Sequence, residues 1–225
     1  MVKKKETLIG TLFVTVSKQL ILKLQQLLSM LVENIFVSTV AVDMLDIDNE
    51  SIKKFCYDLR QQQGETSQYS NYGGWHSKPL TGHIPALNEL FYNVILRLNS
   101  LHEYFNFRDD LKLNIDNCWV NINGKGHVNN PHTHRGWTFS GVYYVTGHEN
   151  CGDLVLEHPS QQFPYHYTEQ PFKEPSIERS MANIYYKPEP CKLIIIPSWI
   201  KHYVLPNLTD QDRISIAFDV NVAQK

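Results

Sequence analysis

The second half of the chain, from Leu111 onward, consists of short strand-like runs, and this pattern restricts the fold more than any other feature. The runs are rich in Val, Ile, Tyr and Trp, and turns containing Gly, Pro and Asn separate them. We place them at residues 112–123, 137–146, 152–157, 182–187, 191–197, 202–206 and 212–221. Strands of this length and spacing predict a β-rich core.

Two helices are expected ahead of these strands. Asp48 or Asn49 can cap the first helix, which runs to about Gln63 and ends at Gly64. Pro85 suits the first turn of the second helix, because its fixed φ angle is compatible with that turn. The second helix carries an apolar stripe made of Leu87, Leu90, Phe91, Val94, Leu98 and Leu101. Helices first and strands later indicate an α+β fold that is mainly β. We expect a double-stranded β-helix (jelly roll) core with the N-terminal helices packed on one sheet.

The chain has 225 residues, which is enough for one sizeable core. We expect a single domain over residues 30–225, with a helical part at about 48–104 and a barrel at about 111–221. Residues 1–29 are interpreted as an N-terminal extension, either helical through its leucines or disordered.

Composition restricts the partners and the compartment. The net charge is −2 and no basic stripe is present, so nothing in the charge pattern supports nucleic-acid binding. No run of about 18 uncharged apolar residues occurs, so no membrane span is expected. The four cysteines form no CxxC pair, which favours a reducing compartment, and we expect the cytoplasm. A homodimer is left open.

His132 and His134, within the sequence 131–134, form the first part of a candidate metal site. Neutral imidazole is a common ligand of transition metals, and residues i and i+2 of a strand share one face. An HxH pair alone is weak evidence, because polar loops often carry histidines. A third histidine on a distant strand would complete a facial set of ligands.

His202 and Arg213 supply the remaining parts of this site. His202 follows the aliphatic run 193–197, a position that suits a ligand at a barrel mouth better than a surface histidine. Arg213 and Ser215 share one strand face, and an inward-facing arginine needs an anion because an unpaired buried charge is costly. A solvated arginine on an outer face is the alternative. Three nitrogen ligands with a carboxylate clamp are the layout of an iron enzyme that uses a 2-oxo acid.

Residues on neighbouring strands are candidates for the pocket walls. Trp119 and Asn121 share one face of the strand before the HxH, and core packing is the expected role of Trp119. Alternation allows only one of Tyr143 and Tyr144 to point inward, but the intervening turn hides which one.

Two further groups are weaker candidates. Asp153 and Glu157 are reserve carboxylate ligands in case His134 does not bind the metal. Trp75 and His76 could form a lid, although their glycine-containing loop is also compatible with simple flexibility. No catalytic side chain beyond the metal ligands is identified.

Six segments, taken in order, carry a family resemblance. They are Gly73-Gly74-Trp75-His76-Ser77, Trp119-Val120-Asn121-Ile122, Pro131-His132-Thr133-His134, Ser140-Gly141-Val142-Tyr143-Tyr144-Val145, Pro197-Ser198-Trp199 with His202, and Arg213-Ile214-Ser215-Ile216-Ala217-Phe218. The ordered set resembles a family of 2-oxoglutarate/Fe(II) oxygenases found in marine bacteria and their phages, which is distantly similar to the prolyl 4-hydroxylase-like oxygenases. The likeness runs from about Val32 to Val220.

This resemblance implies a jelly-roll core, iron at His132 and His202, and the distal carboxylate of 2-oxoglutarate on Arg213. It also implies that Tyr144 touches 2-oxoglutarate. The chain departs from the wider superfamily at His134, where a carboxylate is usual, and we expect this histidine to be the third metal ligand. The expected function is an Fe(II)/2-oxoglutarate-dependent dioxygenase of the hydroxylase type, acting on a small molecule or a peptide.

Two other functions stay open at this point. A cupin-like dioxygenase would use three histidines without 2-oxoglutarate, although Thr138 and Phe139 stand where a cupin would carry a glutamate. A jelly-roll binding module would need no metal. Metal content together with 2-oxoglutarate-dependent succinate release separates the three functions.

Overall fold

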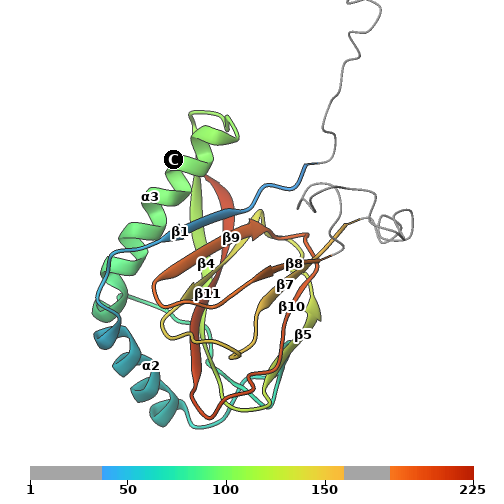
Figure 1. Ribbon diagram of the computed structural model, residues 1–225. Coiled ribbons are helices and arrows are strands. Elements are labelled where there is room, and N and C mark those ends of the chain that lie inside the picture. The colour runs from blue at the N-terminus through green and yellow to red at the C-terminus, as the bar shows by residue number, and fades with distance from the viewer. Residues whose placement is uncertain (1–36, 160–182) are drawn as a thin grey trace, which may run out of the picture. The chain divides into compact units, whose positions relative to one another are not determined.

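The computed structural model of the chain describes residues 37–159 and 183–225. These residues contain two α-helices, one 3₁₀ helix and eleven strands (Figure 1). The N-terminal extension expected at residues 1–29 lies outside them. Neither of the described α-helices is long and apolar enough to cross a lipid bilayer.

Two antiparallel sheets form the core of the fold. The larger sheet has the order β1-β9-β6-β11-β4-β3. Its strands are β1 (Ala41–Met44), β9 (Lys192–Pro197), β6 (Phe139–Tyr144), β11 (Arg213–Gln224), β4 (Leu111–Asn123) and β3 (Trp75–His76). The smaller sheet has the order β2-β5-β10-β7-β8. Its strands are β2 (Asn71–Tyr72), β5 (Val128–His132), β10 (His202–Val204), β7 (Leu154–Glu157) and β8 (Asn183–Tyr186).

Both predicted helices are confirmed. Helix α2 (Asn49–Gln63) is capped by the side chain of Asp48, and Gly64 ends it with a φ angle of 66°. The second helix starts as the 3₁₀ turn η1 (Pro85–Leu87), which continues directly into α3 (Asn88–Tyr104). Most of the predicted apolar stripe of this helix is fully buried.

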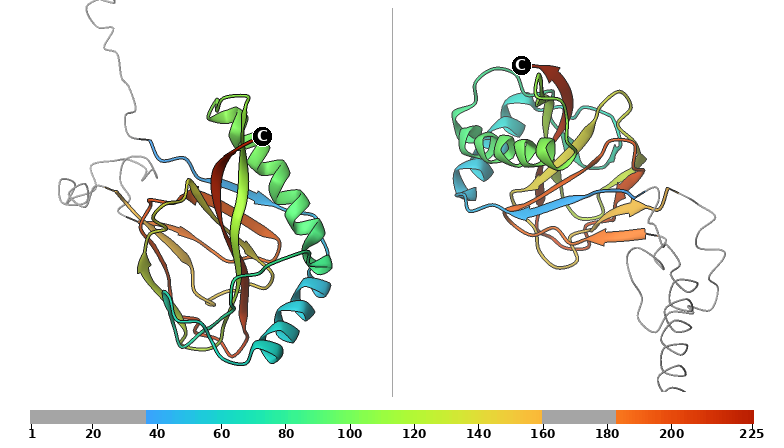
Figure 2. Two further views of the ribbon diagram at one scale, coloured as in Figure 1. Left: turned by 180° about the vertical axis from the view of Figure 1, so that it is seen from behind. Right: turned by 90° about the horizontal axis from the view of Figure 1, so that it is seen from above.

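The larger sheet separates two apolar layers. Figures 1 and 2 show α2 and α3 on one side of it and the smaller sheet on the other. Successive residues of a strand point to opposite faces of the sheet. On β11, Ile214 and Ile216 pack toward the helices, whereas on β9, Ile194 and Ile196 pack toward the smaller sheet. This arrangement confirms the predicted jelly roll with its helices on one sheet.

Four strands were not predicted: β1, β2, β3 and β5. The lid expectation for Trp75 and His76 is wrong, because these residues form β3. They pair with Ile122 and Asn121 of β4, and both are buried. Hydrogen bonding to β4 fixes them in the wall of the larger sheet rather than in a movable loop.

Candidate metal centre

The three predicted histidines converge at one end of the smaller sheet. His132, the last residue of β5, is the cross-strand partner of His202, the first residue of β10. His134 lies two residues beyond β5, where its backbone N–H donates a 2.9 Å hydrogen bond to the carbonyl of Ser198. The expectation that His132 and His134 project from a single strand is therefore wrong. One ring nitrogen of each histidine nevertheless lies within 4.8 Å of the other two.

Each of the three imidazoles is held through its Nδ1 atom, which leaves Nε2 free to bind a metal. In each case an oxygen accepts a hydrogen bond from Nδ1–H and so selects the tautomer with an Nε2 lone pair. The acceptors are the carbonyl of Asn130 for His132 (2.7 Å), the carbonyl of Ile200 for His202 (2.9 Å) and the carboxylate of Asp219 for His134 (2.7 Å).

Burial keeps two of these rings neutral near pH 7. The pKa of His202 is lowered to about 3, mainly by desolvation and to a lesser extent by the neighbouring His132. Desolvation also lowers the pKa of His132 below its ordinary value. Because only the neutral imidazole offers a lone pair, both side chains can bind a metal at physiological pH.

An inner cavity of about 80 Å³ lies between the two sheets, beside the histidines. Its lining includes His132, His134 and His202 at one end, together with Arg213, Ser215, Tyr144, Asn121 and Trp119. All of the predicted site residues therefore meet in one place. A cavity of this size has room for several water-sized groups, which suits a small cosubstrate rather than a large substrate.

Arg213 points into this cavity and is only 3% exposed. Its Nη1 donates hydrogen bonds of 2.8 and 2.9 Å to the carbonyls of Cys151 and Gly152. Within the described part of the chain, no hydrogen bond engages its Nη2 or Nε. Burial lowers the pKa of Arg213, which shows that the charge is poorly solvated. Two free nitrogens, Nε and Nη2, on a poorly solvated cation are the donors that a carboxylate can bind side by side.

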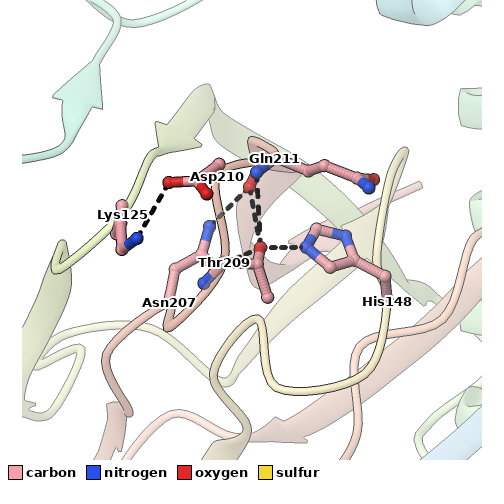
Figure 3. Close-up of polar contacts among 6 residues, drawn as sticks. All are labelled: Lys125, His148, Asn207, Thr209, Asp210 and Gln211. Atoms are coloured by element: carbon pink, nitrogen blue, oxygen red, sulfur yellow. Dashed lines mark hydrogen bonds and ion pairs between the residues drawn. The ribbon is translucent and has the colours of Figure 1, made fainter.

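The loop before Arg213 is fixed by a network of polar side chains (Figure 3). Asn207, which is fully buried, donates to the carbonyls of Asn123 and Gln211 and accepts from the backbone and hydroxyl of Thr209. Thr209 in turn contacts Nε2 of His148 at 2.5 Å. Sequence reasoning missed this network, which joins the loop of His148 to the loop of Asn207. These two loops carry the backbone carbonyls that Arg213 contacts.

The structure shows which of the two tyrosines, Tyr143 or Tyr144, points into the cavity. Tyr144 lines the inner cavity, whereas Tyr143 packs in the helix layer and donates a 2.6 Å hydrogen bond to Asn49. Burial raises the pKa of Tyr144, so its phenol stays protonated and can donate a hydrogen bond. The Oδ1 atom of Asn121 is buried without a hydrogen-bond partner among the described residues. A ligand or water in the cavity would donate the missing hydrogen bond to this oxygen, because an unpaired buried amide oxygen is costly.

Trp119 lines the pocket, as one of its two expected roles required, whereas the favoured core-packing role is wrong. It belongs to neither apolar layer, and its ring stacks between His76 (centroid distance 5.5 Å) and His134 (5.9 Å). Tyr69 continues this row of rings, 4.7 Å from His76. The row borders an outer cleft of about 500 Å³ that opens onto the same histidines. Trp119 is therefore a wall shared by the cavity and the cleft.

The two reserve carboxylates do not reach the histidine cluster. Glu157 forms an ion pair with Lys201 at 2.9 Å, and Asp153 lines a separate surface depression. The carboxylate beside the cluster is Asp219, which sequence reasoning missed. Continuing the alternation of Arg213 and Ser215 along the same strand would have placed Asp219 on the cavity face.

The donor set fits a first-row transition metal and a dicarboxylic acid. Imidazole nitrogen suits iron as well as zinc, copper and nickel, and three ligands on one side leave positions open for further ligands. The free guanidinium nitrogens lie in the same cavity, so one molecule with a carboxylate at its far end could contact both groups.

Comparison with known proteins identifies one matching family. The sequence model described as "Putative 2OG-Fe(II) oxygenase" matches residues 117–219, a stretch that contains the three histidines of the cluster, Arg213 and Asp219. No curated protein matches the chain.

Solved structures share the fold at low sequence identity. A prolyl-4-hydroxylase from Pseudomonas putida has a TM-score of 0.54 and 12% identity, over 82% of this chain and 93% of that one. A prolyl hydroxylase from Trichoplax adhaerens, solved with a hypoxia inducible factor peptide, has a TM-score of 0.56 and 15% identity, over 81% and 83%. A viral collagen prolyl hydroxylase from Paramecium bursaria Chlorella virus-1, in its 2-oxoglutarate complex, has a TM-score of 0.52 and 12% identity, over 80% and 94%.

Proposed function

We propose that this chain, whose residues 117–219 belong to the 2-oxoglutarate/Fe(II) oxygenases, binds iron through its three clustered histidines and 2-oxoglutarate through Arg213. We further propose that it acts as a hydroxylase-type dioxygenase. One observation carries the residue assignment. Three imidazoles with free Nε2 atoms and one guanidinium with free N–H groups line the same small cavity.

Iron with bound 2-oxoglutarate supplies the oxidation, in which dioxygen and 2-oxoglutarate give succinate, CO2 and one oxygen atom inserted into a substrate C–H bond. The protein's own residues position the reactants. Arg213 would hold the far carboxylate with paired charged hydrogen bonds. The hydroxyls of Ser215 and Tyr144 line the same cavity and would donate to the same cosubstrate.

The outer cleft is the proposed site of the primary substrate. It reaches His132 and His134 from outside, whereas Arg213 lies in the inner cavity. Its volume falls in the range typical of small-molecule sites, and a peptide side chain would also fit. Its described lining contains aromatic rings, prolines, amides, hydroxyls and one carboxylate, that of Asp219, but no lysine or arginine. An uncharged small molecule or peptide segment therefore suits it better than an anion.

The cytoplasm is the proposed compartment. All four cysteines are free thiols, as expected under reducing conditions. Burial raises the pKa of Cys56 and of Cys118 to about 12, so neither is a reactive thiolate.

The test combines metal analysis of the purified full chain with succinate release from 2-oxoglutarate under air. Iron together with 2-oxoglutarate-dependent succinate supports the proposal, even without the primary substrate, because uncoupled turnover suffices. Iron without such turnover would favour a cupin-like three-histidine dioxygenase. Protein that binds no metal would leave only a binding module.

A further inference from the structure

The orienting partner of His134 differs in kind from those of the other two histidines. His132 and His202 each donate from Nδ1 to a neutral backbone carbonyl. His134 instead contacts the carboxylate of Asp219 at 2.7 Å. The cluster thus has one charged partner, and it is attached to the histidine that occupies the position of the usual carboxylate ligand.

Asp219 is built into this position. It lies on the cavity face of β11, is 3% exposed, and accepts a 2.9 Å hydrogen bond from the hydroxyl of Ser140. Asn117 donates to its second oxygen at 3.3 Å. Three donors from three different segments satisfy a carboxylate that would be costly to bury alone. Among the described residues, none of its partners is a lysine or arginine, so no permanent cation in this part of the chain cancels its negative charge.

We propose that Asp219 is a positioning residue that holds His134 in its metal-binding tautomer and supplies, through that imidazole, the negative charge that a carboxylate ligand would place directly on iron. This inference rests on the proposed function of the three histidines. A carboxylate behind a metal-bound imidazole fixes the ring and increases the basicity of the ligating nitrogen. The stacking of Trp119 on His134, with an interplanar angle of 14°, restricts the same ring from the side.

Asp219 is the one of the three histidine partners that a side-chain substitution can change. The carbonyl partners of His132 and His202 belong to the backbone and survive any side-chain substitution. Asp219→Asn, by contrast, keeps the size of the side chain and an oxygen that can accept the Nδ1 hydrogen bond. The substitution removes only the negative charge. Its effect on metal binding therefore measures the contribution of that charge, apart from the size and the hydrogen bond of the side chain.

The experiment titrates Co(II) into the metal-free full-length protein. Asp219→Asn is expected to weaken Co(II) binding by about 10- to 100-fold, the usual effect of losing such an outer partner. It is also expected to raise the reduction potential of the iron-loaded protein, because the oxidised metal loses more stabilisation than the reduced one. Asp212→Asn is the matched control. It removes the same charge just before β11, where the carboxylate contacts Tyr57 and Arg60 rather than a histidine, and both quantities are expected to stay at wild-type values.

Wild-type affinity and potential in Asp219→Asn would overturn the inference while leaving the proposed function intact. Wild-type protein that binds no Co(II) and no iron would overturn both. Nitrogen NMR of the His134 ring in Zn(II)-loaded wild-type protein needs no variant. A proton on Nδ1 with the metal on Nε2 supports the inference, whereas metal on Nδ1 contradicts it.

Discussion

His132 and His202 are direct cross-strand partners in β5 and β10, and their ring centroids lie 4.4 Å apart. Because both side chains project from one strand pair, the separation of two metal ligands is set by sheet geometry and not by loop conformation. This pair supplies two of the three proposed metal ligands, and His134 would add the third from outside the strand.

His202→Ala is expected to abolish iron binding and leave the protein folded. It removes one of three ligands, and the remaining two cannot complete a facial set. The fold should persist because the ring of His202 belongs to neither apolar cluster and contributes one hydrogen bond, to the carbonyl of Ile200. The measurement is iron content of the purified variant together with its thermal unfolding. His83→Ala, at an exposed position, is the control and should keep its iron. Unchanged iron in the His202 variant would contradict the ligand assignment.

Arg213→Ala is expected to weaken 2-oxoglutarate binding by about 10- to 100-fold while iron binding stays intact. Loss of a charge-assisted hydrogen-bonded pair typically costs about 1.5–3 kcal/mol. Arg213→Lys, which keeps the charge but not the planar fork, should fall between the wild type and the alanine variant. The apparent constant for 2-oxoglutarate in uncoupled succinate release is the readout.

Arg108→Ala is the matched control, since this exposed arginine pairs only with Asp110 near the surface. A 2-oxoglutarate constant that does not move in Arg213→Ala would mean that Arg213 serves only to hold the loop carbonyls of Cys151 and Gly152.

The metal-free protein is expected to lose stability as the pH falls below about 6.5. The folded-state pKa of His202 is about 3, below the ordinary value of 6.5. Between these values the unfolded chain binds a proton that the folded chain does not, so the free energy of unfolding falls with falling pH. One such group contributes at most about 1.4 kcal/mol per pH unit.

Urea unfolding of chelator-treated protein from about pH 7 to about pH 4 measures this slope. His202→Gln should reduce the slope, and His83→Gln should leave it unchanged. Equal slopes in the wild type and His202→Gln would show that His202 titrates normally in the folded state.

The sequence predicted the site better than the strand that carries it. Alternation with aliphatic residues predicts that Arg213 and Ser215 share one strand face, but it leaves open whether that face is inward or solvated. In the structure this face is buried. Strand β5 was missed because its sequence, with asparagines and a proline before His132, is poor in strand-forming residues. Pairing with β2 and β10 makes it a strand, and such long-range pairing leaves no local signal.

Trp119 and Asp219 show a second limit. Periodicity tells which residues share a face but not whether that face packs on apolar neighbours or lines a cavity, so Trp119 was assigned to the core. The contact between Asp219 and His134 joins β11 to the segment after β5, and nothing in the sequence of either segment predicts it. They meet because the smaller sheet, which contains β5, packs against the larger sheet, which contains β11.

His134→Asp is expected to retain iron, because aspartate is a competent ligand in the usual His/carboxylate/His set. The structure adds a complication. The new carboxylate would lie near that of Asp219, which now faces an imidazole, and two like charges at such a distance disfavour each other. A bound Fe(II) cation relieves this repulsion, and an aspartate ligand needs no partner on an imidazole Nδ1. Removing the Asp219 charge is therefore expected to weaken iron binding less in His134→Asp than in the wild type.

The substitution Asp219→Asn thus has different expected sizes of effect in two backgrounds. It weakens metal binding strongly beside His134, where the carboxylate supports an imidazole, and less beside an aspartate, which needs no such support. A double-mutant cycle on iron affinity, read by anaerobic competition with a chelator, measures this coupling directly. Uncoupled decarboxylation of 2-oxoglutarate provides a second readout that needs no knowledge of the substrate. If Asp219→Asn weakens iron binding equally in both backgrounds, the carboxylate acts on the metal through space and not through the imidazole of His134.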